Sequence, residues 1–230
     1  YFINFAANSF VGSSWDMPFN HMQTNCMAVL HQLEAIRRHV PHCRYYNAGS
    51  SEEFGDVIES PQSESHPLRP RSPYGASKAS ARHLVKVYRD SYDIYAVQGW
   101  LFNHEGVRRG EEFVTRKITK NVARIYHDYE SGKSITPLQL GNIDSKRDWS
   151  DAEDFVKGVW LMLNQNRDNP KDYVLSSNET HTIREFVVEA FNFAGFHRNQ
   201  CRWKGKDLEE KYFHGPDCLM EVNKDFYRPA

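Results

Sequence analysis

The stretch Ser72-Pro73-Tyr74-Gly75-Ala76-Ser77-Lys78 predicts the start of the helix around which the chain is organised. Ser72 is a preferred N-cap residue, and Pro73 takes the first helical position, where its missing N–H costs no hydrogen bond. Tyr74 and Lys78 are four residues apart, so they lie on one face of this helix. Helical spacing continues that face to Tyr92, and we expect all of it to point inward. The members that follow Lys78 on this face are Ala81, Val85, Tyr88 and Tyr92.

Tyr74 and Lys78 suggest proton chemistry at the head of this buried face. A cation beside a phenol favours the phenolate form of the phenol. Such a tyrosine can take a proton from a substrate hydroxyl while a hydride leaves the same carbon. The pair alone also fits a helix start with a lysine stem packed along the surface, so the surrounding sequence must separate the two interpretations.

Strand-like and helical patterns alternate along the chain. Buried strands are predicted at residues 1–7, 43–48, 94–101 and 172–176, and helices at 18–39, 73–92, 113–131, from Ser150 (with Glu153 as a capping box) and from Thr182 (with Glu185) to Gly195. This alternation predicts an α/β fold with a doubly wound parallel sheet. The last thirty residues have an irregular pattern, with short strand candidates at 201–203 and 219–223.

Polar residues follow the ends of several predicted strands. They are Asn8, Ser9, Ser50, Ser51, Glu52, Asn103 and His104. In doubly wound sheets the ligand site forms at the carboxyl ends of the strands, so we expect these residues to converge on one crevice.

Ser50 and Glu52 extend the chemistry that Tyr74 and Lys78 permit. The Ser50 hydroxyl can hydrogen-bond a substrate oxygen and the carbonyl formed from it. The Glu52 carboxylate can remove the proton next to that carbonyl and protonate a departing hydroxyl on the neighbouring carbon. Together these roles describe internal oxidation, elimination of water and return of the hydride. The alternative for this segment is a solvated turn after a strand.

Basic residues gather between positions 108 and 124 and recur later in the chain. They are Arg108, Arg109, Arg116, Lys117, Lys120, Arg124, Arg147 and Arg228. Arginine forks and lysine charges commonly bind diphosphates. Lys120 and Arg124 fit a solvated helix face better, whereas Arg147 lies near Trp149 in an extended piece.

Composition narrows the class of protein. The 230 residues carry a net charge of −1, which does not favour a nucleic-acid partner. No apolar run approaches the length of a membrane span, and no His or Cys spacing indicates a metal site. The four cysteines are scattered without a Cys-x-x-Cys pair, which favours reduced thiols in a cytoplasmic protein.

Seven motifs together resemble the GDP-mannose 4,6-dehydratase family of extended short-chain dehydrogenase/reductases over nearly the whole chain. They are Ser50-Ser51-Glu52, Tyr74-Gly75-Ala76-Ser77-Lys78, Leu101-Phe102-Asn103-His104-Glu105, Arg108-Arg109-Gly110, Phe113-Val114-Thr115-Arg116-Lys117-Ile118, Lys146-Arg147-Asp148-Trp149 and Phe226-Tyr227-Arg228-Pro229. The resemblance implies an NADP-binding Rossmann-like domain followed by a smaller substrate domain. It also implies conversion of GDP-mannose to GDP-4-keto-6-deoxymannose, a step towards GDP-fucose.

The resemblance also implies roles for individual residues. Catalysis is implied for Ser50, Glu52, Tyr74 and Lys78; cofactor binding for Ala6, Tyr74, Lys78, Leu101, Asn103, His104, Arg108 and Arg109; and substrate binding for Ser9, Ser50, Glu52, Asn103, Lys117, Arg147 and Arg228. Arg108 and Arg109 match a loop that reaches a neighbouring subunit's cofactor site, which implies a homodimer or homotetramer. The implied domains are residues 1–105, with returning segments near 135–155, and residues 106–230.

Several positions depart from the family's pattern. Gly49 replaces a serine, Glu53 replaces an apolar residue, and Gly106 and Val107 replace serine and proline. An inward-pointing Glu53 would raise the pKa of Glu52, although neighbouring strand residues face opposite sides. These changes affect the choice of sugar more than the reaction class, so a GDP-heptose or another GDP-hexose is an alternative substrate.

The thirteen glycines include no Gly-x-Gly-x-x-Gly turn of the kind that binds a cofactor pyrophosphate. We therefore expect these residues to be the interior of a longer protein, with an exposed edge where further strands of the sheet belong. A non-catalytic remnant that lacks the phosphate site is the alternative from another class of function. A GDP-sugar epimerase or reductase is the alternative enzyme, which would need Tyr74 and Lys78 but not Glu52.

Overall fold

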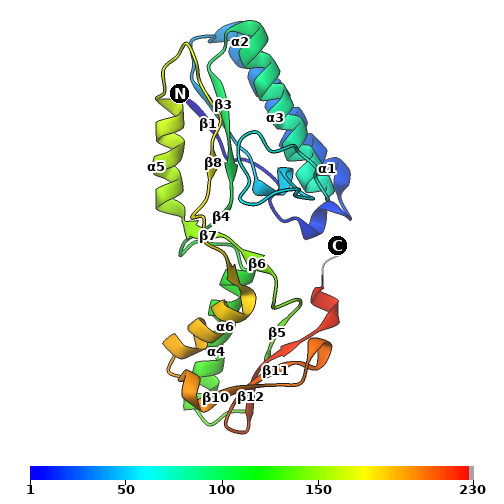
Figure 1. Ribbon diagram of the computed structural model, residues 1–230, viewed down its shortest axis with the longest axis vertical. Coiled ribbons are helices and arrows are strands. Elements are labelled where there is room, and N and C mark those ends of the chain that lie inside the picture. The colour runs from blue at the N-terminus through cyan, green and yellow to red at the C-terminus, as the bar shows by residue number, and fades with distance from the viewer. Residues whose placement is uncertain (228–230) are drawn as a thin grey trace. The chain divides into compact units, whose positions relative to one another are not determined.

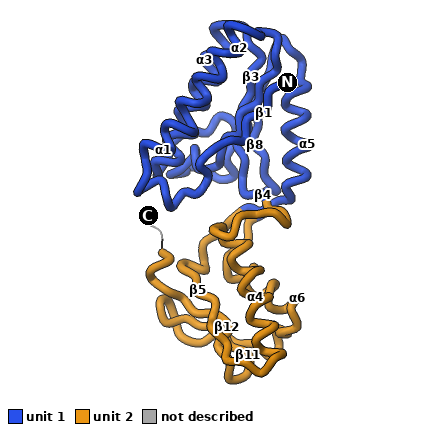
Figure 2. The backbone as a smooth tube through the Cα atoms, turned by 180° about the vertical axis from the view of Figure 1, so that it is seen from behind, with its two compact units in different colours: residues 1–104, 148–179 blue, residues 105–147, 180–230 orange. Residues whose placement is uncertain are grey.

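The computed structural model describes residues 1–227 and divides into two compact units, coloured separately in Figure 2. Unit 1 comprises residues 1–104 and 148–179, and unit 2 comprises residues 105–147 and those from Thr180 onward. The segment that returns to unit 1 therefore lies at residues 148–179, later than the region near 135–155 that the sequence indicated.

Unit 1 is built on a four-stranded sheet with the order β1-β2-β3-β8. Its strands are β1 (Phe2–Asn4), β2 (Tyr45–Ala48), β3 (Ala96–Leu101) and β8 (Val174–Leu175). Every neighbouring pair is parallel. The prediction of a parallel sheet in an α/β fold is confirmed, and the carboxyl ends of these strands share one edge.

Helices cover both faces of this sheet, as Figure 1 shows. They are α1 (Pro18–Met22), a π-helical turn (Gln23–Met27), α2 (Ala28–His39), α3 (Pro73–Tyr92) and α5 (Ala152–Leu163). Helices α2 and α3 share one hydrophobic cluster with Tyr45, whereas α5 packs in another cluster with Tyr46. Adjacent strand residues point to opposite faces, so this alternation gives the doubly wound arrangement.

Helix α3 begins as its sequence predicts. The Ser72 hydroxyl accepts a hydrogen bond from the Gly75 amide at 3.0 Å, and Pro73 is the first helical residue. Asp93, in the left-handed conformation with φ 52°, follows its last turn. The inward face is wrong at Tyr92, the last residue of α3, which is 50% exposed although its ring contacts that of the buried Tyr88.

Two further predictions about local structure are wrong. The first strand is only three residues long, and Phe2 and Ile3 are exposed because β1 lies at the edge of the sheet. Helix α5 is capped by Asp151, whose carboxylate accepts from the Glu153 amide at 2.7 Å, and not by Ser150. Ser150 belongs instead to strand β7 (Trp149–Asp151), which pairs with β4 (Asn103–Glu105).

Unit 2 has a mixed sheet with the order β10-β11-β12-β5. Its elements are α4 (Val114–Glu130), β5 (Leu138–Leu140), β6 (Lys146–Arg147), β9 (His181–Thr182), α6 (Ile183–Phe193), β10 (Cys201–Lys204), β11 (Lys211–His214) and β12 (Asp217–Val222). The C-terminal region is therefore an ordered antiparallel sheet, and the expectation of irregular structure there is wrong. Strand β11 escaped prediction because its alternating pattern is short and flanked by charged residues.

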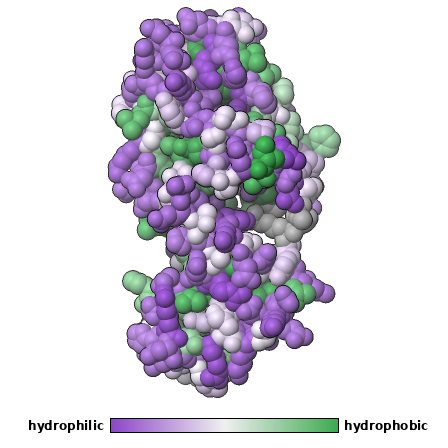
Figure 3. Space-filling model, viewed as in Figure 1, coloured by the Kyte–Doolittle hydropathy of each residue, from purple (hydrophilic) through white to green (hydrophobic). Residues whose placement is uncertain are grey.

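Short 3-10 helices connect these elements at Gly12–Ser14, Ser51–Glu53, Arg198–Gln200, Asp207–Glu209 and Lys224–Phe226. Hydrophilic side chains cover most of the face in Figure 3, and apolar ones form small scattered groups. Within residues 1–227, no helix has the length and apolar character needed to cross a membrane.

Candidate active site

Strand β2 ends in a tight turn that presents Ser50 and Glu52. Ser50 caps the 3-10 helix Ser51–Glu53, and its hydroxyl accepts a hydrogen bond from the Glu52 amide at 3.2 Å. Gly49 is required before this cap because a Cβ there would lie 2.2 Å from the carbonyl oxygen of Gly99 on β3. The turn is therefore held close to the sheet at the carboxyl ends of the strands.

The first turn of α3 packs directly against this serine turn. A Cβ added at Gly75 would lie 2.6 Å from the carbonyl oxygen of Glu52. The glycine that follows Tyr74 thus permits a close approach between the two backbones. As a result, Glu52 and Tyr74 belong to neighbouring segments of one site although they are distant in sequence.

Lys78 follows Tyr74 by one turn of α3, and its side chain is buried. Its Nζ donates a hydrogen bond to the carbonyl oxygen of Ala48 at 2.9 Å and lies 5.9 Å from the centre of the Tyr74 ring. Burial lowers the pKa of Lys78 to about 8, and attraction to Glu53 opposes this change. Tyr74 is 7% exposed, and its ring makes an edge-on contact with the His21 ring.

Asn25 fastens the loop after β1 to helix α3. Its amide nitrogen donates to the Asn8 carbonyl at 3.0 Å and to the Ser77 hydroxyl at 3.1 Å, and its oxygen accepts from the Asn8 amide at 2.9 Å. Sequence reasoning missed this residue. Its signal was a polar residue on the inner face of a helix, in the segment that the structure shows to be π-helical. The exposed residues Ala6 and Ser9 lie on the loop that it holds.

The end of β3 supplies the remaining predicted residues of unit 1. Leu101 is buried at the carboxyl end of the strand, where it is paired in register with Leu175 of β8. His104 Nδ1 lies 2.9 Å from the Phe102 carbonyl oxygen, and its ring stacks on Phe155 with centres 4.8 Å apart. Asn103 is half-buried. The parallel sheet therefore brings the predicted residues that follow β1, β2 and β3 to one edge.

The predicted residues of unit 2 are described separately. Arg108 is exposed, whereas Arg109 pairs with Glu105 at 3.2 Å and lies over the Phe113 ring. Arg147 Nη1 donates to the Lys146 carbonyl at 2.7 Å. Arg228 lies outside the described residues.

Lys117 lines a shallow cavity of about 430 Å³ with residues of α4 and β5. Its Nζ lies 3.3 Å from the centre of the Phe226 ring, and burial lowers the pKa of Lys117. Lys120 instead pairs with the exposed Glu111, and Arg124 pairs with Asp128 one turn along the helix. Of these basic residues, Lys117 is thus the one with a partly buried ammonium.

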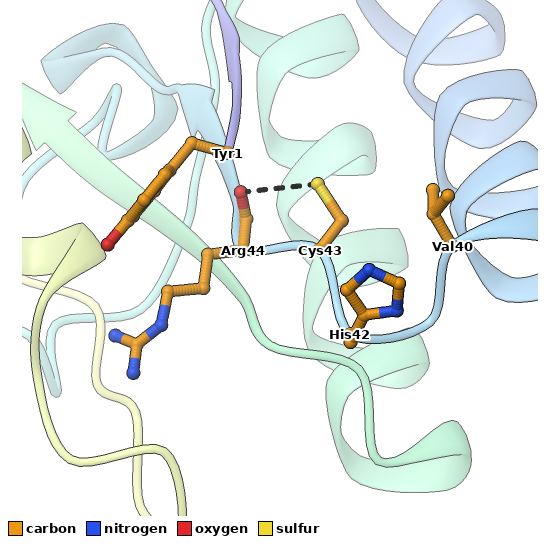
Figure 4. Close-up of a pocket in the computed structure, with 5 residues that line it drawn as sticks. All are labelled: Tyr1, Val40, His42, Cys43 and Arg44. Carbon is orange, nitrogen blue, oxygen red and sulfur yellow. Dashed lines mark hydrogen bonds between the residues drawn. The ribbon is translucent and has the colours of Figure 1, made fainter.

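Unit 1 has a cavity of about 390 Å³ at the end of its sheet that lies away from Ser50 (Figure 4). It is lined by Tyr1, Val40, His42, Cys43 and Arg44. Cys43 and Arg44 precede β2, so this cavity is at the amino ends of the strands. Ligands of doubly wound folds bind at the carboxyl ends, which favours the Ser50 edge as the active site.

Glu53 has a buried position at this site that the sequence did not indicate. Its side chain is fully buried and forms an ion pair with Arg82 of α3. Its Oε1 also accepts from the Ser50 amide at 2.8 Å. The sequence left the direction of Glu53 open because its partner lies far along the chain.

Comparisons with known proteins identify the family of this chain. The model of the GDP-mannose 4,6 dehydratase family matches residues 1–230. A GDP-mannose 4,6 dehydratase of Drosophila melanogaster shares 42% identity with this chain, and one of Homo sapiens shares 41%. Each alignment covers 99% of this chain. The chain spans 56% and 59% of those two relatives, so it corresponds to little more than half of their length.

Solved structures share the fold. The structure of RMD from Pseudomonas aeruginosa complexed with NADPH is similar to 84% of this chain, with a TM-score of 0.75, 24% identity and 65% of its own length covered. A UDP-glucose 4-epimerase of Thermus thermophilus in complex with NAD is similar to 96% of the chain, with a TM-score of 0.70, 24% identity and 68% of its length covered. The match of the family model to residues 1–230 and the relatives of 42% and 41% identity show that the chain belongs to the GDP-mannose 4,6-dehydratase family.

Proposed function

We propose that the protein containing this chain is an NADP-dependent GDP-mannose 4,6-dehydratase that produces GDP-4-keto-6-deoxymannose. The observation that carries the proposal is the contact between the Glu52 backbone and Gly75, which sets the Ser50–Glu52 turn against the helix start with Tyr74 and Lys78. The named relatives support the choice of substrate.

Oxidation at C4 of the hexose is the first step. The Tyr74 phenolate takes the proton of the C4 hydroxyl while a hydride leaves C4, and Lys78 favours the phenolate by its charge. A bound nicotinamide would accept that hydride and later return it. The Ser50 hydroxyl donates a hydrogen bond to the new C4 carbonyl oxygen.

Elimination of water follows from the acidity of the carbon next to the ketone. Glu52 removes the C5 proton, and the electron pair of that bond forms the C5–C6 double bond as the C6 hydroxyl leaves. The proton held by Glu52 passes to the departing oxygen, so water is released. The hydride returns to C6 and the proton held by Tyr74 passes to C5, which restores both groups and completes a reaction without net oxidation.

The unit 1 residues fit a nicotinamide cofactor. Lys78 Nζ has three donor hydrogens, of which Ala48 takes one, and the other two would serve the cofactor ribose and the Tyr74 oxygen. Ala6 has a small exposed side chain at the end of β1, where a cofactor can approach the backbone. Ala6, Leu101, Asn103 and His104 are therefore proposed for cofactor binding. We choose NADP because the Pseudomonas aeruginosa structure contains NADPH, although other neighbours contain NAD.

Unit 2 is proposed as the sugar-nucleotide domain. Lys117, which lines its cavity, offers a cation for a diphosphate, and the Phe226 ring lies against that cation. Ser9, Arg147 and Arg228 complete the proposed contacts to GDP-mannose, and Asn103 is shared with the cofactor. Arg108 and Arg109 are proposed to reach the cofactor of a second copy in a dimer or tetramer.

The direct test is incubation of the intact protein with NADP and GDP-mannose, followed by mass spectrometry of the nucleotide sugars. We expect a product lighter than the substrate by one water and carrying a carbonyl. An isomer of unchanged mass would instead indicate an epimerase, and unaltered substrate in the presence of bound cofactor would contradict both activities.

A further inference from the structure

Glu53 is the anchor of the turn that carries Ser50 and Glu52. One of its carboxylate oxygens accepts the Ser50 amide at 2.8 Å, while the Ser50 hydroxyl accepts the Glu52 amide at 3.2 Å. This reciprocal capping box closes the turn on itself. The Glu53 side chain therefore holds the backbone of Ser50, and the Ser50 hydroxyl in turn holds the backbone of Glu52.

A fully buried carboxylate needs a counter-charge, and Arg82 supplies it. The Arg82 Nε donates to Glu53 Oε2, and its Nη1 donates to the Gln98 carbonyl oxygen at 3.0 Å. The guanidinium also lies over the Trp100 ring, with its Cζ 3.4 Å from the ring centre. Because Arg82 is held on several sides, it presents a fixed donor to Glu53.

Arg82 comes one helical turn after Lys78 on α3. The helix that carries the proposed base and its lysine thus also delivers the cation that holds the serine turn. Gly75 sets the spacing at the start of the same helix, and Arg82 fixes it two turns later. The two halves of the proposed active site are joined by one buried ion pair.

A row of amides across the sheet ends at the same carboxylate. Asn4 donates to Asn47 at 2.8 Å, Asn47 donates to Gln98 at 2.6 Å, and Gln98 donates to Glu53 at 3.1 Å. An ionised carboxylate only accepts, so Gln98 must turn its NH₂ towards Glu53, and each earlier amide follows the same direction. The charge of Glu53 thus orients polar side chains on β1, β2 and β3.

We propose that Glu53 and Arg82 are positioning residues that set the reactive geometry of Ser50 and Glu52. This inference rests on the proposed dehydratase function. A buried ion pair is often replaceable by apolar residues without loss of stability, so stability alone does not account for it. The hydrogen bond that Glu53 accepts from the Ser50 amide gives the ion pair a role in positioning the serine turn.

The test compares three variants of the intact protein: Glu53→Gln, Glu53→Leu and Arg82→Lys. Two quantities are measured for each, the kcat and KM for GDP-mannose and the hydrogen exchange of peptides covering residues 49–55. Glu210→Gln is the matched control, since Glu210 pairs with Arg184 through two hydrogen bonds of 2.6 and 2.9 Å in unit 2. Like the test variants, Glu210→Gln disrupts a carboxylate–arginine pair, and this pair is partly buried.

We expect each test variant to lower kcat by roughly 10- to 100-fold, the loss that a small misplacement of reacting groups causes. KM should stay within about twofold, because the sugar nucleotide is not touched. Exchange at residues 49–55 should quicken in the test variants and stay unchanged in Glu210→Gln. If Glu53→Leu does not fold, Glu53→Gln and Arg82→Lys decide the outcome.

Wild-type kcat and wild-type exchange in Glu53→Gln and Arg82→Lys would overturn the inference. A wild-type protein that binds NADP but leaves GDP-mannose unchanged would overturn the proposed function instead. In that case the exchange comparison alone decides whether the pair positions the turn.

Discussion

Lys78 Nζ donates a hydrogen bond to the carbonyl oxygen of Ala48, 2.9 Å away, so the lysine of α3 is tied to the last residue of strand β2. The bond fixes the ammonium below the turn that carries Ser50. The ammonium is buried where it makes this bond, and burial lowers the pKa of Lys78 to about 8. A buried cation at this position therefore weakens the fold while it serves the proposed chemistry.

Lys78→Met tests this conflict between stability and activity. Because folded Lys78 binds its proton less tightly than the unfolded chain does, the free energy of unfolding rises with pH between about 8 and 10.5. At pH 7 the variant should unfold with a free energy about 1–3 kcal/mol higher than wild type, and turnover should be lost. Denaturant unfolding at several pH values should show this gap closing as the pH approaches 10.5.

Lys86→Met is the control, because Lys86 is an exposed lysine of the same helix that pairs with Asp90. It should change stability little at any pH in this range. This account of Lys78 would be refuted if Lys78→Met were less stable than wild type at pH 7 and the difference in their free energies of unfolding did not change with pH.

Tyr74→Phe removes the proposed base and keeps the ring against His21. Turnover should fall by roughly 10²- to 10⁴-fold, as expected for the loss of a general base, while GDP-mannose still binds. Steady-state kinetics and calorimetric binding measure the two effects. Tyr92→Phe, on the exposed end of the same helix, should behave as wild type, and normal turnover in Tyr74→Phe would rule out its assignment.

Glu52→Gln separates oxidation from elimination. The variant should still transfer the C4 hydride, so reduced cofactor should accumulate, but water loss should fall by roughly 10²- to 10⁴-fold. Cofactor absorbance and product mass report the two steps. Glu59→Gln, an exposed carboxylate of the following loop, is the control. Water loss from Glu52→Gln at the wild-type rate would show that another group is the base.

Gly75→Ala tests the packing of α3 on the serine turn. Its Cβ would meet the Glu52 carbonyl oxygen at 2.6 Å, so one backbone must move. We expect a loss of about 1–3 kcal/mol of stability from overpacking, together with a lower kcat. Ala76→Gly, the next residue along, should cost about 1 kcal/mol through helix propensity alone and leave kcat unchanged. Wild-type kinetics in Gly75→Ala would mean that the contact does not position Glu52.

Local patterns were sufficient to predict several elements of both units. Ser72 and Pro73 predicted the start of α3, and the Thr182–Glu185 capping box predicted the start of α6. Such features depend on hydrogen bonds between residues three positions apart, which a sequence displays directly. The alternation of strands with helices predicted the parallel sheet because parallel strands need crossover connections, which are usually helices.

Features that depend on distant partners could not be predicted. Glu53 is buried only because Arg82, from the next helix, reaches it. Asn25 acts through Asn8 and Ser77, which lie on two other segments. Ser150 does not cap α5 because strand β7 continues to Asp151 and the helix begins only at Ala152, which makes Asp151 the N-cap.

The most direct test of the proposed reaction uses GDP-mannose carrying deuterium at C4, given to the intact protein with NADP. The account predicts a 4-keto product that has lost one water and carries the deuterium at C6, because the hydride removed beside Tyr74 returns after Glu52 has driven the elimination. A product of unchanged mass, or a dehydrated product with no deuterium at C6, would contradict it.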